Sequence, residues 1–135
     1  MMKKTKVKKV YNALNELDYS IVEYKISQNK NIQKKIIPRM KKEGLRFIAL
    51  CAVSKKKLAP SYLVDEFWHN SILQTQLYTK IGKICGKFIH HNANDGSKEA
   101  RTKDLSAFWN TIDEYESVFG TPDLEIWGIE RREKK

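Results

Sequence analysis

The stretch PRMKKEGLRFIALCAVS, from Pro38 to Ser54, contains the longest apolar run of this 135-residue chain and decides which fold we predict. Its apolar residues recur at helical spacing: Met40, Phe47, Ile48, Cys51 and Ala52. This spacing predicts a helix that begins near Pro38, since proline is tolerated in the first turn of a helix. Gly44 weakens that helix by about 1 kcal/mol relative to alanine. The alternative is a strand over 45–53, because this segment is continuously apolar after Arg46.

The segments on either side have the same helical periodicity. Helices are expected over 7–17, 20–29, 61–73, 75–88 and 98–119, with Ser61, Thr75 and Ser97 as amino-terminal caps and Gly120 with Pro122 at the last helix end. We therefore predict a mainly α, compact single-domain helical bundle of about five helices, with a short strand or an extended tail. Within the single domain 1–135, residues 1–57 form basic helices, 58–128 a module rich in Trp and His, and 129–135 a frayed tail.

Positive charge is concentrated in the amino-terminal part of the chain. Residues 1–57 carry 16 Lys and Arg against 4 Asp and Glu, a net charge of +12, whereas residues 58–135 carry 10 against 12, a net charge of −2. Such a basic segment attracts the phosphate backbone of nucleic acids, because each neutralised phosphate releases counterions. An ordinary solvated lysine face is the alternative.

Several protein classes are not indicated by the sequence. The two cysteines, Cys51 and Cys85, are too few for a disulfide framework, and we expect both to remain reduced thiols. The first residues are positively charged but lack the apolar run of a signal peptide, and no apolar stretch approaches the roughly 20 residues that cross a membrane. We therefore expect a soluble protein of the cytoplasm, in a bacterial or phage-infected cell.

The three histidines of the chain lie in two neighbouring segments, VDEFWHNSIL (64–73) and CGKFIHHN (85–92). On a helix, Asp65 and His69 lie one turn apart at the edge of the apolar face. With His90 and His91 they are candidate ligands of a divalent transition metal. A second hypothesis is an acid–base pair of Asp65 and His69.

A third hypothesis is purely structural. Hydrogen bonds among buried polar groups would then hold the ends of helices together. The members of this polar cluster are Asp65, His69, Thr75, Tyr78 and His90. Trp68, Trp109 and Trp127 are expected in the core, as is Cys85. Tyr11 and Tyr24, next to lysines, are the better candidates for stacking on bases.

The region from Pro60 to Trp127 resembles a family of small, uncharacterised bacterial proteins that is similar to a segment of the plant glycine-rich-domain-containing proteins. The shared pattern is D-x-x-W-H-x-x-I-L-x-T-x-x-Y, followed by C-G-x-F-x-H-H, here from Asp65 to Tyr78 and from Cys85 to His91. The resemblance implies that Asp65, His69 and His90 belong to one spatial cluster. It implies no reaction.

Our functional prediction is based on the positive charge that is concentrated in residues 1–57. We expect a small, basic, non-enzymatic protein that contacts RNA or a ribonucleoprotein complex, with no membrane partner and no required cofactor. A phage-type inhibitor that binds the effector of an RNA-guided (CRISPR) nuclease would have this size and charge. The expected contact residues are Lys3, Lys4, Lys6, Lys8, Lys9, Lys34, Lys35, Lys41, Lys42, Lys55, Lys56 and Lys57. The alternative is a metal-binding protein or metal-dependent enzyme that uses Asp65, His69, His90 and His91.

Overall fold

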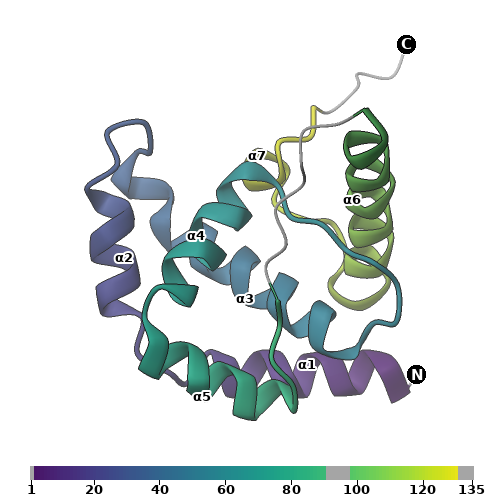
Figure 1. The fold of residues 1–135 in the computed structure, drawn as a ribbon, viewed down its shortest axis with the longest axis horizontal. Helices are drawn as coiled ribbons and strands as arrows, with labels where there is room; N and C mark the ends of the chain where they lie inside the picture. Colours follow the sequence, from purple (N-terminus) through teal and green to yellow (C-terminus); the bar gives the residue numbers. More distant parts are fainter. Residues whose placement is uncertain (1, 91–97, 131–135) are drawn as a thin grey trace.

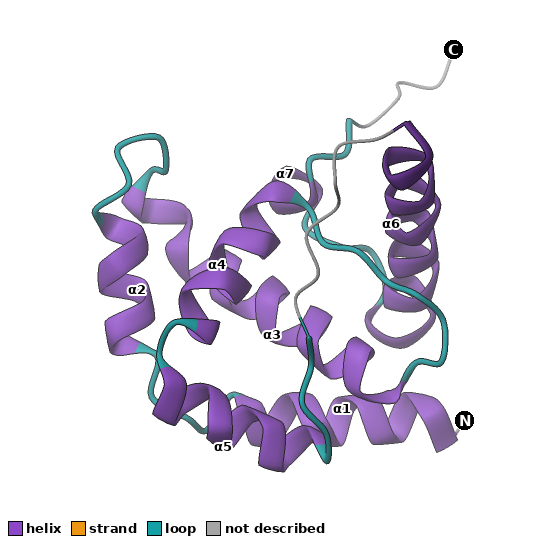
Figure 2. Cartoon of the chain, in the orientation of Figure 1, coloured by secondary structure: helices purple, strands orange, loops and turns teal. Residues whose placement is uncertain are grey.

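The computed structural model describes residues 2–90 and 98–130, and these form helices without any strand (Figure 2). The elements are α1 (Met2–Leu14), α2 (Ser20–Ser27), the 3₁₀-helix η1 (Lys34–Ile36), α3 (Ile37–Val53), α4 (Tyr62–Ile72), α5 (Thr75–Cys85), α6 (Lys98–Phe119) and α7 (Leu124–Trp127). The predicted mainly α fold is confirmed, with more helices than the five expected.

Helix α3 lies in the middle of the molecule and contacts every other helix of the described chain (Figure 1). Its residues 47–50 are all fully buried. A helix that neighbours cover on all sides has apolar residues all round its axis. Its sequence therefore lacks the separate apolar and polar faces of an amphipathic helix. The strand alternative over 45–53 is therefore wrong, because the continuous apolar run belongs to a helix that neighbours surround.

A glycine brings α3 and α4 into close contact. A Cβ atom added to Gly44 would lie 2.5 Å from Cδ2 of Phe67, which is far inside the contact distance of two carbon atoms. Phe67 is fully buried, and its ring also packs against that of Tyr19, with ring centroids 5.7 Å apart. Gly44 thus allows a large side chain of α4 to fill the space directly against the backbone of α3.

Helix α1 packs along α3 and runs in the opposite direction, below it in Figure 1. At the start of α1, Lys3 pairs with Glu114 of α6, beside the carboxyl end of α3. Further along α1, the ring centroid of Tyr11 lies 5.5 Å from the guanidinium of Arg46 of α3. Val7 and Leu14 are fully buried on the side that faces α3. The lysines between these positions consequently point to solvent.

The chain after α6 folds back onto the core. Gly120, with φ +85, ends α6 in the left-handed conformation that glycine favours. Asp123 caps α7 and receives two hydrogen bonds from Arg39, of 2.7 and 2.8 Å. Trp127 is 1% exposed and packs against Phe47 of α3. This short helix therefore closes the core next to the beginning of α3.

Some local expectations differ from the structure. Ser61 caps α4 as predicted, since its hydroxyl accepts a hydrogen bond of 3.2 Å from the amide of Val64. Thr75 is not a cap, because it is the first helical residue of α5 and Gln74 precedes it as the cap residue. Trp109 was expected in the core but is 49% exposed, because it lies on a side of α6 that the described elements leave open. The cap predicted at Ser97 lies outside the described residues.

Candidate nucleic-acid interface

Five lysines of α1 point to solvent within two turns of the helix. Lys3, Lys4, Lys6, Lys8 and Lys9 are all exposed, while Val7 between them is buried. No Asp or Glu occurs in residues 1–15. The exposed side of α1 is therefore a concentrated source of positive potential.

A second group of lysines lies next to this helix. Lys55, Lys56 and Lys57 follow the carboxyl end of α3, and all three are exposed. Glu114 connects the two groups, because Lys3 donates a hydrogen bond to it and Lys56 acts on it electrostatically. Burial raises the pKa of the Glu114 carboxyl, but its interactions with Lys3, Ser54 and Lys56 outweigh burial and lower that pKa below its ordinary value.

These two groups form one surface, which we call the amino-terminal lysine surface. Its members are Lys3, Lys4, Lys6, Lys8, Lys9, Lys55, Lys56 and Lys57. It combines a helix with a loop that is more than forty residues away in the chain. The structure thus brings together eight of the twelve lysines that the sequence predicts as contacts.

The other four predicted lysines lie towards the opposite end of α3. Lys34 and Lys35 are exposed on η1, and Lys41 and Lys42 lie in the first turns of α3. Since an α-helix rises 1.5 Å per residue, the part of α3 from Lys41 to its end at Val53 is about 18 Å long.

Acidic residues surround the lysines at that opposite end. The ammonium of Lys41 lies 5.4 Å from the ring centroid of Tyr19 and acts electrostatically on Asp18. Lys42 acts on Asp123, whose pKa is lowered chiefly by its hydrogen bond from Arg39. Positive charge is therefore partly neutralised here, as it is by Glu114 on the amino-terminal lysine surface.

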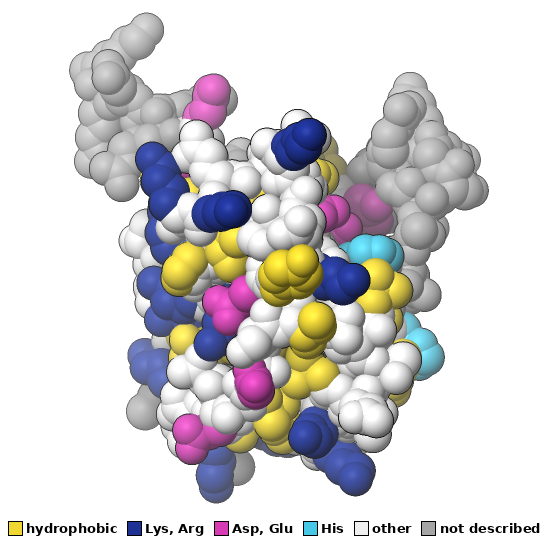
Figure 3. All heavy atoms as spheres, turned by 90° about the vertical axis from the view of Figure 1, so that its left-hand side faces the viewer, with side chains coloured by type: hydrophobic (Ala, Val, Ile, Leu, Met, Phe, Trp, Pro, Cys, Tyr) yellow, Lys and Arg dark blue, Asp and Glu magenta, His cyan; other side chains and the backbone are white. Residues whose placement is uncertain are grey.

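Figure 3 shows the face that carries α2, the left-hand side of Figure 1. Lys and Arg side chains gather along one edge and at the bottom of this face, and hydrophobic side chains are exposed at its centre. Three large hydrophobic residues of α2 and of the turn after α4 are exposed: Ile21, Tyr24 and Leu73. On this face, Lys and Arg side chains therefore lie beside the exposed hydrophobic side chains as well as along the edge.

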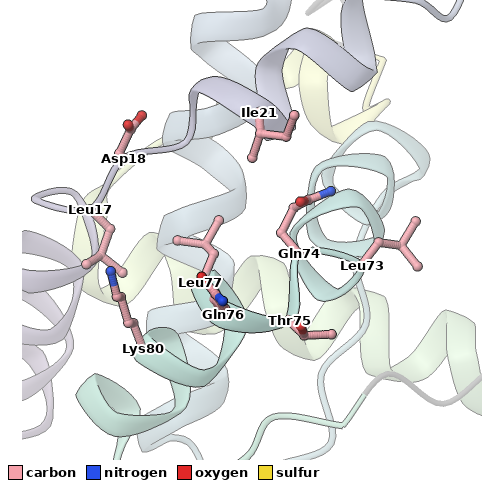
Figure 4. Close-up of a pocket in the computed structure, with 9 residues that line it drawn as sticks. All are labelled: Leu17, Asp18, Ile21, Leu73, Gln74, Thr75, Gln76, Leu77 and Lys80. Carbon is pink, nitrogen blue, oxygen red and sulfur yellow. The ribbon is translucent and has the colours of Figure 1, made fainter.

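A hollow of about 420 Å³ lies between the α1–α2 connection and the start of α5. Figure 4 shows Asp18 and Lys80 at one end of it and Leu73 at the other. Its lining mixes leucines with glutamine side chains and includes none of the twelve predicted lysines. This hollow is therefore distinct from the proposed contact surface.

The predicted metal ligands do not form a cluster within the described residues. Asp65 is half-buried on α4 and His69 is exposed there, while His90 is exposed in the segment after α5. No group of three or more His, Cys, Asp or Glu side chains that could hold a metal ion occurs in residues 2–90 and 98–130. His91 lies outside them. The metal site stays a prediction, which elemental analysis of untagged protein would test.

The polar contacts near the histidines are centred on Tyr78. Nε1 of Trp68 donates a hydrogen bond of 2.9 Å to the Tyr78 hydroxyl, which in turn donates to the carbonyl of Ile89. The ring of Phe88 packs edge-on against Tyr78 and also against His90. Burial raises the pKa of Tyr78 to about 12, so its hydroxyl stays protonated and able to donate.

Tyr78 therefore fastens the segment after α5 to α4. The sequence predicts a polar cluster of Tyr78 with Asp65, His69, Thr75 and His90. Of these, the structure links His90 to Tyr78 through Phe88, and it places Thr75 on the surface at the start of α5. The indole of Trp68 was expected only as a core group, and its role as hydrogen-bond donor was missed.

A second buried polar group was missed altogether. Glu43 of α3 is 1% exposed and accepts hydrogen bonds from Nε1 of Trp127 and from the amide of Asp123. The guanidinium of Arg46, one turn along, donates to the Tyr115 hydroxyl at 2.7 Å and lies 4.6 Å from the ring centroid of Phe119. The sequence does contain a signal for this buried pair, because Glu43 and Arg46 are opposite charges three residues apart on a largely apolar helix.

Both cysteines are free thiols. Burial raises the pKa of Cys51 to about 12 and that of Cys85 to about 11. A thiol is a nucleophile and a metal ligand as the thiolate, which is scarce at neutral pH when the pKa is this high. These values agree with the expected role of Cys85 as a packing residue. Among the described helices, none is long and apolar enough to cross a membrane.

A protein-family model with the description UCP032817-like matches residues 3–118, which is most of the chain. The matched region includes the whole amino-terminal lysine surface as well as α4 and α5. No curated protein and no solved structure matches the chain significantly.

Proposed function

This chain belongs to the UCP032817-like family, and we propose that it is a non-enzymatic binding protein that contacts RNA, or a complex of nucleic acid and protein, through the amino-terminal lysine surface. The observation that supports this proposal is that α1, with five exposed lysines, and residues 55–57, with three, meet at Glu114, on which Lys3 and Lys56 both act. In the sequence these lysines are two separate runs.

The physical basis is the release of counterions from the phosphate backbone. Each lysine that neutralises a phosphate frees a condensed cation, so binding is driven by entropy and weakens as salt is added. Contacts of this kind carry no direct sequence information. The protein should therefore bind many sequences with similar affinity.

The test is fluorescence anisotropy with a labelled 20-nucleotide RNA of mixed sequence at several potassium chloride concentrations. One variant carries Lys4→Gln, Lys6→Gln, Lys8→Gln and Lys9→Gln. Since each phosphate contact to a single strand contributes about 0.7 to the slope of log K against log salt, the loss of four contacts should reduce that slope by about 3.

A matched control removes the same charge elsewhere. It carries Lys25→Gln, Lys30→Gln, Lys80→Gln and Lys83→Gln, four exposed lysines outside the amino-terminal lysine surface. This control should keep most of the affinity and the slope. The proposal is overturned if the unmodified protein binds neither this RNA nor a nucleic-acid duplex at 50 mM salt, or if both variants lose affinity equally. It is also overturned if the protein recovered from cells holds an acidic protein through this surface after nuclease treatment.

A further inference from the structure

The exposed aromatic residues of the described chain belong to other segments than the two that carry the amino-terminal lysine surface. Proteins that bind single strands combine a positive groove with aromatic side chains on which the bases stack, each worth about 1–3 kcal/mol. In the described chain, the exposed aromatic side chains are Tyr24 on α2, Tyr62 on α4, Phe88 after α5 and Trp109 on α6. None of them belongs to α1 or to residues 55–57.

The one aromatic residue of α1 is already occupied by contacts within the protein. The ring of Tyr11 is half-buried, and it packs edge-on against Phe119 with centroids 5.8 Å apart. The guanidinium of Arg46 lies 5.5 Å from its centroid. The sequence suggested Tyr11 as a stacking residue, but its ring belongs to an internal cluster. The amino-terminal lysine surface thus offers charge without a stacking partner.

The shape of this surface also differs from a channel for a single strand. Its lysines project from the outer side of a helix that packs along α3. Three hollows of about 420, 490 and 460 Å³ lie elsewhere, between α2 and α5, beside α7, and beside the end of α5. None of the three is lined by a lysine of α1 or of residues 55–57. A convex, charged helix can lie along a duplex, whose phosphates are exposed on the outside.

We infer that the amino-terminal lysine surface binds double-helical nucleic acid in preference to single strands. This inference depends on the proposed function and names the form of nucleic acid that the surface takes. Double-stranded DNA carries one negative charge per about 1.7 Å of its axis, which is twice the density of one strand. A surface that provides positive charge but no aromatic residue for stacking should bind most tightly to the ligand with the higher charge density.

The experiment compares four ligands of 20 nucleotides or base pairs: a mixed-sequence duplex and an unstructured single strand, each as RNA and as DNA. Dissociation constants are measured by anisotropy from 50 to 200 mM potassium chloride. The duplexes should bind at least tenfold more tightly than the single strands at equal salt. The slope of log K should be about 0.9 per contact for duplex DNA and 0.7 for a single strand. The RNA and DNA arms show which duplex is preferred.

Two aromatic variants, Tyr24→Ala and Trp109→Ala, complete the design. Both side chains are exposed, so each variant should bind single strands as the unmodified protein does. If single strands bind as tightly as duplexes, or if either variant weakens single-strand binding tenfold, the inference is wrong while the proposed function stands. If neither form binds, the proposed function itself fails. Melting temperatures of both variants show that the fold is retained.

Discussion

Nε1 of Trp127 donates a hydrogen bond of 2.9 Å to Oε1 of Glu43, a residue 84 positions earlier in the chain. The same carboxylate oxygen accepts a hydrogen bond from the amide of Asp123, and Nη1 of Arg46 lies 3.9 Å from the other oxygen. Helix α3 is thereby fixed to α7 through one buried carboxylate. Such a group is costly to bury, so its partners determine whether it stabilises the fold.

We predict that Glu43→Ala lowers the free energy of unfolding by about 3–5 kcal/mol, because it leaves the indole N–H and the guanidinium without this partner. Glu43→Gln should cost less, since its amide oxygen can still accept from Trp127. Urea unfolding followed by circular dichroism measures both values. Equal losses in the two variants would show that the charge, rather than the hydrogen bond to Trp127, makes the contribution.

The contact of Gly44 with Phe67 leads to a second prediction. Gly44→Ala would place a Cβ atom 2.5 Å from Cδ2 and 3.0 Å from Cγ of a fully buried ring. Overpacking of this kind costs about 1–3 kcal/mol, more than the roughly 1 kcal/mol that alanine gains over glycine in a helix. We expect a net loss of up to about 2 kcal/mol in the free energy of unfolding, measured in urea.

Gly82→Ala is the matched control for that experiment. Gly82 also lies within a helix, but a Cβ atom there would meet only the carbonyl oxygen of Lys87, at 3.6 Å. This variant should be neutral or more stable by up to about 1 kcal/mol. A stabilised Gly44→Ala variant would contradict the close approach of α3 and α4, and Gly44→Ala combined with Phe67→Leu should recover stability.

Periodicity predicted most of the helices but could not show which of them lies at the centre. The run from Phe47 to Leu50 was consistent with a helix or a strand, because full burial removes the alternation on which the distinction depends. Trp109 illustrates the same limit, since its exposure depends on which neighbours cover α6. The sequence shows that a residue is apolar, but it does not show whether another helix packs against that residue.

The candidate surface was predictable only in part, for a similar reason. The number of lysines and their runs can be counted in the sequence. The acidic partners of these side chains cannot be identified from the sequence, because they lie far away in the chain. Lys42 and Arg39 interact with Asp123, and Lys3 pairs with Glu114. Carboxylates from distant parts of the chain therefore partly neutralise both groups of lysines.

Those ion pairs predict how stability depends on pH. The pKa of Asp123 is lowered from 3.8, chiefly by the hydrogen bond from Arg39, and that of Glu114 is lowered from 4.5 because its lysine partners outweigh burial. A carboxyl whose pKa is lower in the folded state stabilises the protein above its ordinary pKa, and this contribution is lost as the pH falls through the lowered value. We expect constant stability between about pH 7 and 5.5 and a progressive loss below about pH 4.5.

Urea unfolding at pH 7, 5, 4 and 3 tests this expectation. Asp123→Asn should lower stability at pH 7 and flatten the decline at acidic pH, because the variant lacks one of the carboxyls whose pKa is lowered while asparagine can still cap α7. Gln76→Ala, at an exposed uncharged position, should keep the decline of the unmodified protein. If Asp123→Asn declines as steeply as the unmodified protein, the Arg39 pair does not contribute to its pH dependence.

The hydroxyl of Tyr78 joins α5 to α4 and to the segment that carries His90, so its removal should loosen that segment first. Tyr78→Phe takes away the acceptor of the Trp68 indole and the donor to the Ile89 carbonyl, which should cost about 1–3 kcal/mol in urea unfolding. Amide hydrogen exchange over residues 86–90 should also become faster than in the rest of the core. Tyr24→Phe makes the same chemical change at a side chain that is 58% exposed, and it should alter stability by no more than about 0.5 kcal/mol. If the two variants behave alike, the hydrogen bonds of Tyr78 do not hold the segment in place. The packing of Phe88 against the Tyr78 ring would then be the contact that holds it.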